Sequence, residues 1–305
     1  MWAENIALAF IISVTFYITL PVKTEKRLFI AQGATSKSII TQLGTRGYDV
    51  GFIDSIILSY LGKIDKGEVR FKKNVVGRLD FLYALTKAKV PLLKITLIPG
   101  ETTEIFLGLV AKKLDINATK LMHAYKTEAK YPEAAISADT YLVPKKMNET
   151  KLIKFLLASS ERKYKKLSIE AYGDYNQTSW HRILTIASII QKEAANNKEM
   201  PLVSSVIYNR LKKNMRLQMD GTLNYGKYSH IKVTPQRIRT DLSSFNTYKH
   251  KGLPDSPIGS VSTAAIKAAI HPAKTNYLYF MRNAKGVHDF TDTFEKHRQN
   301  IKKAR

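Results

Sequence analysis

Residues 180–197, WHRILTIASIIQKEAANN, carry the clearest helical pattern in the chain, and an acidic residue lies near its end. On a helix, Glu193 lies three residues after Ile190 and seven after Ile186, so its carboxylate shares a face with isoleucines. Burial against such a face disfavours the charged form and raises the pKa, as a general acid working near neutral pH requires. A solvated glutamate at a helix end is the commoner case, so the spacing alone does not identify a catalytic group.

Two polar segments follow this helix: LQMDGTLNYG at 217–226 and FNTYKHKGLPDSPIG at 245–259. Amide and carboxylate groups bond to sugar hydroxyls and N-acetyl groups, and tyrosine rings pack on the apolar faces of sugars. An ordinary polar cleft uses the same residue types, so both interpretations stay open on this pattern alone. The candidate contacts are Gln218, Asp220, Thr222, Asn224, Tyr225, Asn246 and Tyr248.

Local signals place further elements on both sides of the helix. Ser179 can cap it, and it is expected to run through Ala194. Residues 216–260 are rich in Gly, Pro, Asn, Thr and Tyr and predict loops and short strands. Also predicted are helices at 77–88, 148–164, 201–214 and 262–270, a strand at 67–71, and a hairpin with its turn at 283–286.

Two earlier segments resemble each other: RLFIAQGATSKSIITQLGTRGY at 27–48 and ITLIPGETTEIFLGLVAKKLDI at 95–116. Each predicts a short strand, a glycine-containing turn and a helix capped by Ser or Thr. Such a unit is common in proteins that mix helices and strands, so it is weak evidence of a repeat. The expected caps are Thr35 or Ser36 and Thr102 or Thr103, and the expected apolar stripe of the second helix is Ile105, Leu109, Val110 and Leu114.

The N-terminal run at 5–22 contains no charged residue and is just long enough to span a bilayer. It lacks a basic region before it and a small-residue cleavage site after it, so we expect an uncleaved anchor. A buried core helix, the alternative, would show polar residues at every third or fourth position. Lys23, Lys26 and Arg27 follow the run and favour a cytoplasmic C-terminal side, although long domains translocate largely regardless of flanking charge.

The chain is strongly basic, with 49 Lys and Arg against 25 Asp and Glu and a net charge of +24. This charge favours a polyanionic neighbour such as nucleic acid, anionic lipid or a wall polymer with peptide carboxylates. The lysines are spread from Lys23 to Lys303, which argues against a specific nucleic-acid surface. With no cysteine and no H-x-x-x-H pair, the sequence predicts no disulfide, no cysteine nucleophile and no zinc site.

An ordered set of short motifs runs through the second half of the chain: ASIIQKE ending at Glu193, VIYNRL at 206–211, Gln218-x-Asp220, NTY at 246–248, GLP at 252–254, HPAKT at 271–275, YLYF at 277–280 and His288-x-Phe290. With these motifs, residues 183–300 resemble the catalytic part of the endolytic murein transglycosylase family, also called YceG-like. The resemblance extends weakly upstream through EAAISADTY at 133–141, which keeps Glu133, Asp139, Thr140 and Tyr141 of the family's pattern. Departures from that pattern include Gln191, where a second glutamate is frequent, and Gly221, where proline is frequent.

The resemblance implies an α+β fold in three parts: a transmembrane helix at 1–22, a LysM-like α/β region at 23–125 and a mixed α+β catalytic domain at 126–305. It implies cleavage of the MurNAc-β-1,4-GlcNAc bond within peptidoglycan strands to leave 1,6-anhydro-MurNAc ends, which would terminate the elongation of nascent strands. Glu193 would be the catalytic acid and then the base. The implied substrate-binding residues are Gln218, Asp220, Tyr225, Asn246, Tyr248 and His288.

The resemblance further implies no cofactor and no metal, and a single-pass protein of the inner membrane whose catalytic domain is periplasmic. Peptidoglycan strands are the implied substrate, cell-wall synthases (penicillin-binding proteins) are candidate partners, and nucleic acid is not expected. A non-catalytic peptidoglycan-binding scaffold is the main alternative, which a cleavage assay separates. Relatives have also been labelled aminodeoxychorismate lyases, but no residue here marks a pyridoxal phosphate lysine.

Overall fold

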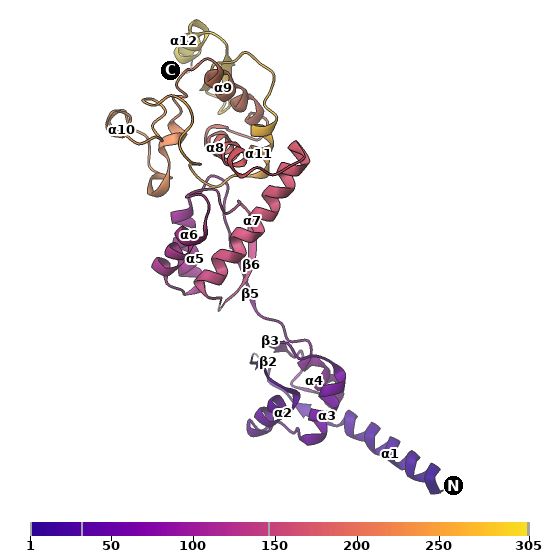
Figure 1. Ribbon diagram of the computed structural model, residues 1–305. Coiled ribbons are helices and arrows are strands. Elements are labelled where there is room, and N and C mark those ends of the chain that lie inside the picture. Colours follow the sequence, from indigo (N-terminus) through magenta and orange to yellow (C-terminus); the bar gives the residue numbers. More distant parts are fainter. Residues whose placement is uncertain (1, 32, 146, 304–305) are drawn as a thin grey trace. The chain divides into compact units, whose positions relative to one another are not determined.

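The computed structural model describes residues 2–31, 33–145 and 147–303 (Figure 1). Helices and short paired strands alternate along the chain, so the fold is mixed α+β. It divides into two compact units, Met1–Leu92 and Leu93–Arg305. This division differs from the expected boundary between 125 and 126, because the second strand and helix segment packs its apolar residues with later elements rather than with the first unit.

The first unit begins with α1 (Trp2–Thr19), an 18-residue helix that is long and apolar enough to cross a membrane and has no buried residue. A helix of this kind near the N-terminus also fits a signal sequence. The elements that follow are β1 (Pro21–Lys23), β2 (Arg27–Ile30), α2 (Ser36–Thr45), α3 (Phe52–Leu61), β3 (Gly67–Arg70), β4 (Val75–Gly77) and α4 (Arg78–Leu85).

The strands of this unit form two antiparallel pairs, β1 with β4 and β2 with β3. Leu28 pairs with Val69, and both belong to a small core that also holds Leu58 and Phe81. The strand expected at 67–71 is confirmed. Thr35 caps α2 as expected, with a capping box in which its side chain and that of Ser38 accept each other's backbone N–H.

The second unit opens with the order strand, helix, helix, strand, as in β2, α2, α3 and β3 of the first unit. Its elements are β5 (Leu92–Thr96), α5 (Thr103–Leu114), α6 (Ala118–Glu128) and β6 (Thr140–Pro144), and β5 pairs with β6. α7 (Glu149–Tyr172) packs on α6. It runs beyond the helix expected at 148–164 and ends where Gly173 adopts a left-handed conformation, φ +81°.

The expected apolar stripe of α5 is partly wrong. Val110 and Leu114 are buried, but Leu109 is 62% exposed. The helix instead buries the face that carries Phe106 and Leu107, which are three to four residues before Val110 and Ala111. Thr102 is the N-cap residue, yet its side chain makes no capping hydrogen bond.

The remaining elements surround α8 (Gln177–Glu193), the central helix of the larger core. Residues 183–190 are all buried, because α9 and α11 pack against this helix. Its cap is Asn176 rather than the expected Ser179, whose backbone N–H donates to Asn176 Oδ1. The other elements are α9 (Met200–Lys212), η1 (Asp220–Leu223), η2 (Gly226–Tyr228), α10 (Pro235–Thr240), α11 (Thr263–Ile270), β7 (Tyr279–Arg282), β8 (His288–Thr291) and α12 (Phe294–Lys303).

The hairpin expected around 283–286 is confirmed, with β7 antiparallel to β8 and Phe280 opposite Phe290. The segment 216–260 contains loops and three short helical turns, and the structure places no strand there. The expected elements did not include α12, which packs on the hairpin.

Candidate active site

The carboxyl group of Glu193 lies at the C-terminal end of the buried helix α8. Ile186, Ile189 and Ile190 are fully buried on that helix, as the spacing predicted. Glu193 itself keeps partial exposure, because the helix ends there and the chain turns away at Ala194. The helix therefore places an acidic group where the apolar core meets a surface cavity.

The backbone N–H of Gly221 donates to Glu193 Oε1 over 2.7 Å. A Cβ atom on Gly221 would lie 2.7 Å from that oxygen and 2.8 Å from the Cβ of Lys192, so only glycine fits without a shift. Proline, the residue frequent here in the family that the sequence resembles, has no N–H and could not make this bond. The departure at Gly221 thus provides a contact to the candidate acid.

Burial raises the pKa of Glu193 to about 7, and the charge of nearby Asp220 acts in the same direction. The Gly221 N–H and the positive charge of Arg210 act against this increase. Near neutral pH both forms of the carboxyl are therefore populated. Such a group can donate a proton in one step and accept one in the next.

Glu193 borders a cavity of about 370 Å³ that several rings surround. Polar groups come from the segment after α9, and rings come from the 246–248 loop, the hairpin and α12. A few polar groups among aromatic side chains are typical of a site that binds an organic ligand. The lining residues are Glu193, Arg210, Leu217, Gln218, Met219, Asp220, Tyr248, Tyr279, Phe280, Phe294 and His297.

Thr247, which is fully buried, joins the two loops that form one side of the cavity. Its carbonyl accepts from the Gln218 N–H over 3.1 Å, and its hydroxyl accepts from the Met219 N–H over 3.1 Å. The Thr222 and Thr247 hydroxyls lie 3.0 Å apart. These bonds hold Gln218 in a left-handed conformation, φ +49°, which is uncommon for a residue other than glycine.

Tyr248 donates its hydroxyl to Asp220 Oδ1 over 2.7 Å at the edge of the cavity. Burial raises the pKa of Tyr248, and the Asp220 carboxylate reinforces the shift, so the phenol is protonated near neutral pH. Asp220 is exposed and is held by this bond, which suits a positioning role rather than that of a second acid.

Arg210 was not a predicted site residue, although it lies within the quoted motif at 206–211. Its Nε donates to the Leu278 carbonyl over 2.6 Å, its Nη1 donates to the Leu217 carbonyl, and its guanidinium lies 5.2 Å from the centre of the Tyr279 ring. It thus connects α9 to the hairpin and places a positive charge near Glu193.

Three of the predicted contact residues do not line the cavity. Asn246 is fully buried and donates to the Ile238 and Asp241 carbonyls over 2.8 Å each, so it fixes the loop instead of facing it. Tyr225 stacks on Phe245 with ring centres 4.2 Å apart. His288 Nδ1 lies 2.7 Å from Glu199 Oε2. The polar residue types of these loops did not show which side chains face the cavity and which hold the loops in place.

The aromatic residues that the hairpin and α12 contribute to the cavity were also not among the predicted site residues. Tyr279 and Phe280 lie in the quoted YLYF motif, whereas Phe294 and His297 lie on the unpredicted helix α12. His297 stacks on Tyr279, with ring centres 5.2 Å apart, and burial lowers its pKa. Its Nδ1 is buried and makes no hydrogen bond among the described residues.

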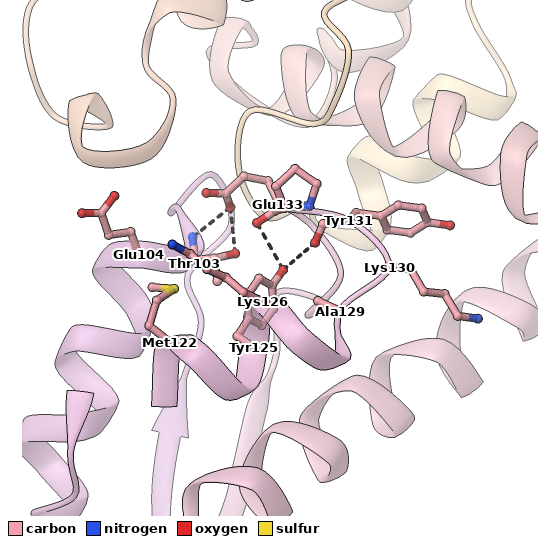
Figure 2. A pocket seen from close by; sticks show the side chains of 10 residues that line it. Thr103, Glu104, Met122, Tyr125, Lys126, Ala129, Lys130, Tyr131 and Glu133 are labelled. Atoms are coloured by element: carbon pink, nitrogen blue, oxygen red, sulfur yellow. Dashed lines mark hydrogen bonds between the residues drawn. The ribbon is translucent and has the colours of Figure 1, made fainter. Parts of the chain in front are cut away.

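A second cavity of about 550 Å³ lies beside another acidic residue, Glu133 (Figure 2). Glu133 Oε2 accepts from both the N–H and the hydroxyl of Thr103, each over 2.8 Å. Burial raises the pKa of Glu133 to about 7. The Tyr125 hydroxyl donates to the Tyr131 carbonyl at 3.1 Å. Glu133 therefore performs the capping of α5 that the sequence assigned to a threonine side chain.

Within 2–31, 33–145 and 147–303, no group of three or more His, Cys, Asp or Glu side chains is placed to hold a metal ion.

The chain matches one protein family and is similar to several known proteins. Residues 28–303 match the sequence profile of the YceG-like family. The chain is 42% identical over 123 residues to an endolytic murein transglycosylase of Bacillus subtilis, a match that spans 40% of this chain and 34% of that protein. It is 32% identical over 127 residues to an endolytic murein transglycosylase of Streptococcus pneumoniae strain D39, spanning 40% of this chain and 23% of that protein.

A crystal structure of a yceG-like protein from Listeria monocytogenes has a similar fold. The TM-score is 0.59 at 26% identity, and the superposition covers 91% of this chain and 99% of that one. The sequence relatives are thus matched over about a third of their length or less, whereas this structural relative is matched almost throughout.

Proposed function

The chain belongs to the YceG-like family, and we propose that it is an endolytic murein transglycosylase that uses Glu193 as its catalytic acid. The observation that carries the proposal is the Glu193 carboxyl, with its pKa near 7, beside a cavity lined by aromatic rings. The two relatives named endolytic murein transglycosylase support the same activity.

In the proposed reaction, protonated Glu193 gives its proton to the glycosidic oxygen between MurNAc and GlcNAc as the C1–O bond breaks. The resulting carboxylate takes the proton of the MurNAc C6 hydroxyl, whose oxygen attacks C1 and closes the 1,6-anhydro ring. An intramolecular hydroxyl replaces water and gains from proximity. One carboxyl group therefore suffices, and Asp220 need not act as a second acid.

The sugar contacts in this proposal come from residues that line the cavity. Gln218 and Asp220 bond to polar substituents, while Tyr248 presents a ring face. Asn246, Tyr225 and His288 contribute by holding the surrounding loops through their bonds and stacking.

The LysM-like assignment is a further proposal for residues 23–125. It is supported by a segment with the order strand, helix, helix, strand, in which the outer strands β2 and β3 pair. The same order recurs from β5 to β6, a segment that begins inside this range and ends beyond it, at Pro144. Isothermal titration of the Glu193→Gln variant with purified glycan strands, with and without substitutions in these segments, tests whether they bind glycan.

The proposed location is the cytoplasmic membrane, with α1 as a single anchor and the rest of the chain in the periplasm. Eighteen residues at 1.5 Å each give about 27 Å, close to the hydrocarbon core of roughly 30 Å. Such an anchor would hold the enzyme where nascent strands leave cell-wall synthases, which fits a terminator of strand elongation. A reporter fused after residue 305 should be active only outside the cytoplasm.

Product analysis separates this function from that of a non-catalytic scaffold. Purified chain incubated with isolated glycan strands should release fragments from strand interiors that end in 1,6-anhydro-MurNAc, lighter by one water than hydrolysis products. Intact strands bound to the protein would instead support the scaffold.

A further inference from the structure

Helix α3 exposes an apolar face in the first unit. Asp54, Ser55 and Leu58 are buried on its inner side. The neighbouring helix α2 exposes polar residues such as Lys37 and Gln42, as a solvated helix does. The exposed apolar residues of α3 share one face, which also holds the exposed Ser59: Phe52 at 72% exposure, Ile53 at 53%, Ile56 at 42% and Tyr60 at 87%.

The first turn of α3 is bonded to the last turn of α1. The Tyr17 hydroxyl donates to Asp54 Oδ2 over 3.0 Å. Arg78, which is almost fully buried, donates to the same oxygen over 2.8 Å, and its guanidinium lies 4.5 Å from the centre of the Tyr17 ring. Figure 1 shows α3 beside the C-terminal end of α1. The two helices therefore occupy a fixed position relative to each other at this point.

This contact fixes the depth of α3 if α1 crosses a bilayer. A span of 18 residues just covers the hydrocarbon core, so Tyr17 lies at the headgroup level, where tyrosine is enriched. Asp54 is one hydrogen bond away from Tyr17 and lies at the same level. The first turn of α3 is thus at the membrane surface, and its apolar residues are next to lipid.

We infer that α3 lies on the membrane that α1 spans, with Phe52, Ile53, Ile56 and Tyr60 inserted at the boundary between headgroups and acyl chains. An amphipathic helix in this position buries its apolar face in lipid. Exposed lysines nearby suit anionic headgroups: Lys23 and Lys26 follow α1, and Lys63 follows α3. The inference rests on the proposed anchor and is independent of the proposed catalysis.

The experiment uses the full chain, whose lack of cysteine allows clean single-cysteine variants. Spin labels at Ile56→Cys on α3, Ile12→Cys on α1 and Leu109→Cys on α5 are compared in vesicles of phosphatidylglycerol and phosphatidylethanolamine. Leu109 is the matched control, an apolar residue that is 62% exposed on a helix of the other unit. Power saturation measures the access of oxygen, which dissolves in lipid, and of a water-soluble nickel chelate.

The labels at Ile12 and Ile56 should be relaxed several-fold more strongly by oxygen than by the nickel chelate, and the label at Leu109 should show the reverse. Equal nickel access at Ile56 and Leu109 would overturn the inference. Nickel access at Ile12 would show that α1 does not span, which would overturn it too. Spin–spin broadening at Ile56 that disappears on dilution with unlabelled chain would assign this face to a second copy and also contradict the inference.

Discussion

Burial affects the pKa of two carboxyl groups of the second unit, Glu193 and Glu133, in the same direction, but their surroundings differ. Burial raises the pKa of both Glu193 and Glu133 to about 7. Two donors from Thr103 hold one oxygen of Glu133 at the start of α5, whereas Glu193 accepts one backbone N–H, that of Gly221. The Glu193 cavity has rings from three segments of the chain, and the Glu133 cavity is bordered mostly by α6 and the loop after it.

The difference shows that a raised pKa reports burial and does not by itself identify a catalytic acid. Glu133 has a structural task, because it satisfies a first-turn amide that would otherwise lack a partner. Glu193 has no comparable task in its helix, since it lies at the end where carbonyls rather than amides are unpaired. Each of the two groups can therefore serve as the control for the other.

The largest expected effect is on turnover after Glu193→Gln. Glutamine keeps the shape but has no acidic proton, so formation of 1,6-anhydro ends should fall by at least on the order of 10²-fold. The melting temperature should change little. Glu133→Gln, assayed beside it on the same purified strands, should keep its turnover within a few-fold. Equal losses of turnover in the two variants would contradict the assignment of Glu193, rather than Glu133, as the acid.

A smaller loss is expected from Gly221→Ala, which brings a methyl group to 2.7 Å from Glu193 Oε1. The carboxyl must move by less than an ångström, so kcat should drop on the order of 10-fold, below the roughly 10²-fold cost of a 1 Å misplacement. Gly108→Ala is the control, because a Cβ there meets nothing within 4 Å. Unchanged kcat in Gly221→Ala would mean that the Gly221 contact does not position the acid.

Stability rather than turnover should respond to Glu133→Ala. Losing the cap of α5 should lower the free energy of unfolding by about 1–2 kcal/mol, measured by denaturant titration. Glu170→Ala, an exposed position on α7, should change it by less than about 0.5 kcal/mol. Turnover per folded molecule should stay near that of the wild type, and a turnover defect with unchanged stability would make Glu133 part of the active site.

The smallest effect is expected from Tyr248→Phe, which removes the hydroxyl bonded to Asp220 and keeps the ring. Loss of one hydrogen bond of this kind should lower kcat/KM by about 2- to 10-fold, and we expect the change mainly in KM because both groups are proposed sugar contacts. Tyr83→Phe, on an exposed part of α4, should have no effect. A loss beyond 10²-fold would assign Tyr248 a part in proton transfer.

Local periodicity was enough to predict the helix that carries Glu193 and the hairpin, because both patterns arise within a few residues. It placed the α5 stripe on Leu109, since only packing decides which of two apolar faces is buried. The loops were recognised as polar, but burial of Asn246 and stacking of Tyr225 depend on neighbours far along the chain. The helix α12 has an amphipathic pattern of its own that would have predicted a helix, but only its packing on the hairpin shows that Phe294 and His297 line the cavity.

The role of Glu193 as the acid is tested directly by the rate of 1,6-anhydro-MurNAc formation as a function of pH, measured for the wild type and for Glu133→Gln. Only protonated Glu193 can start the reaction, so kcat/KM should be level at low pH and fall as pH rises through about 7. The same fall should persist in Glu133→Gln, because Glu193 is unchanged there. A rate that stays level from pH 5 to 9, or a fall that disappears in Glu133→Gln, would contradict the assignment of Glu193 as the acid.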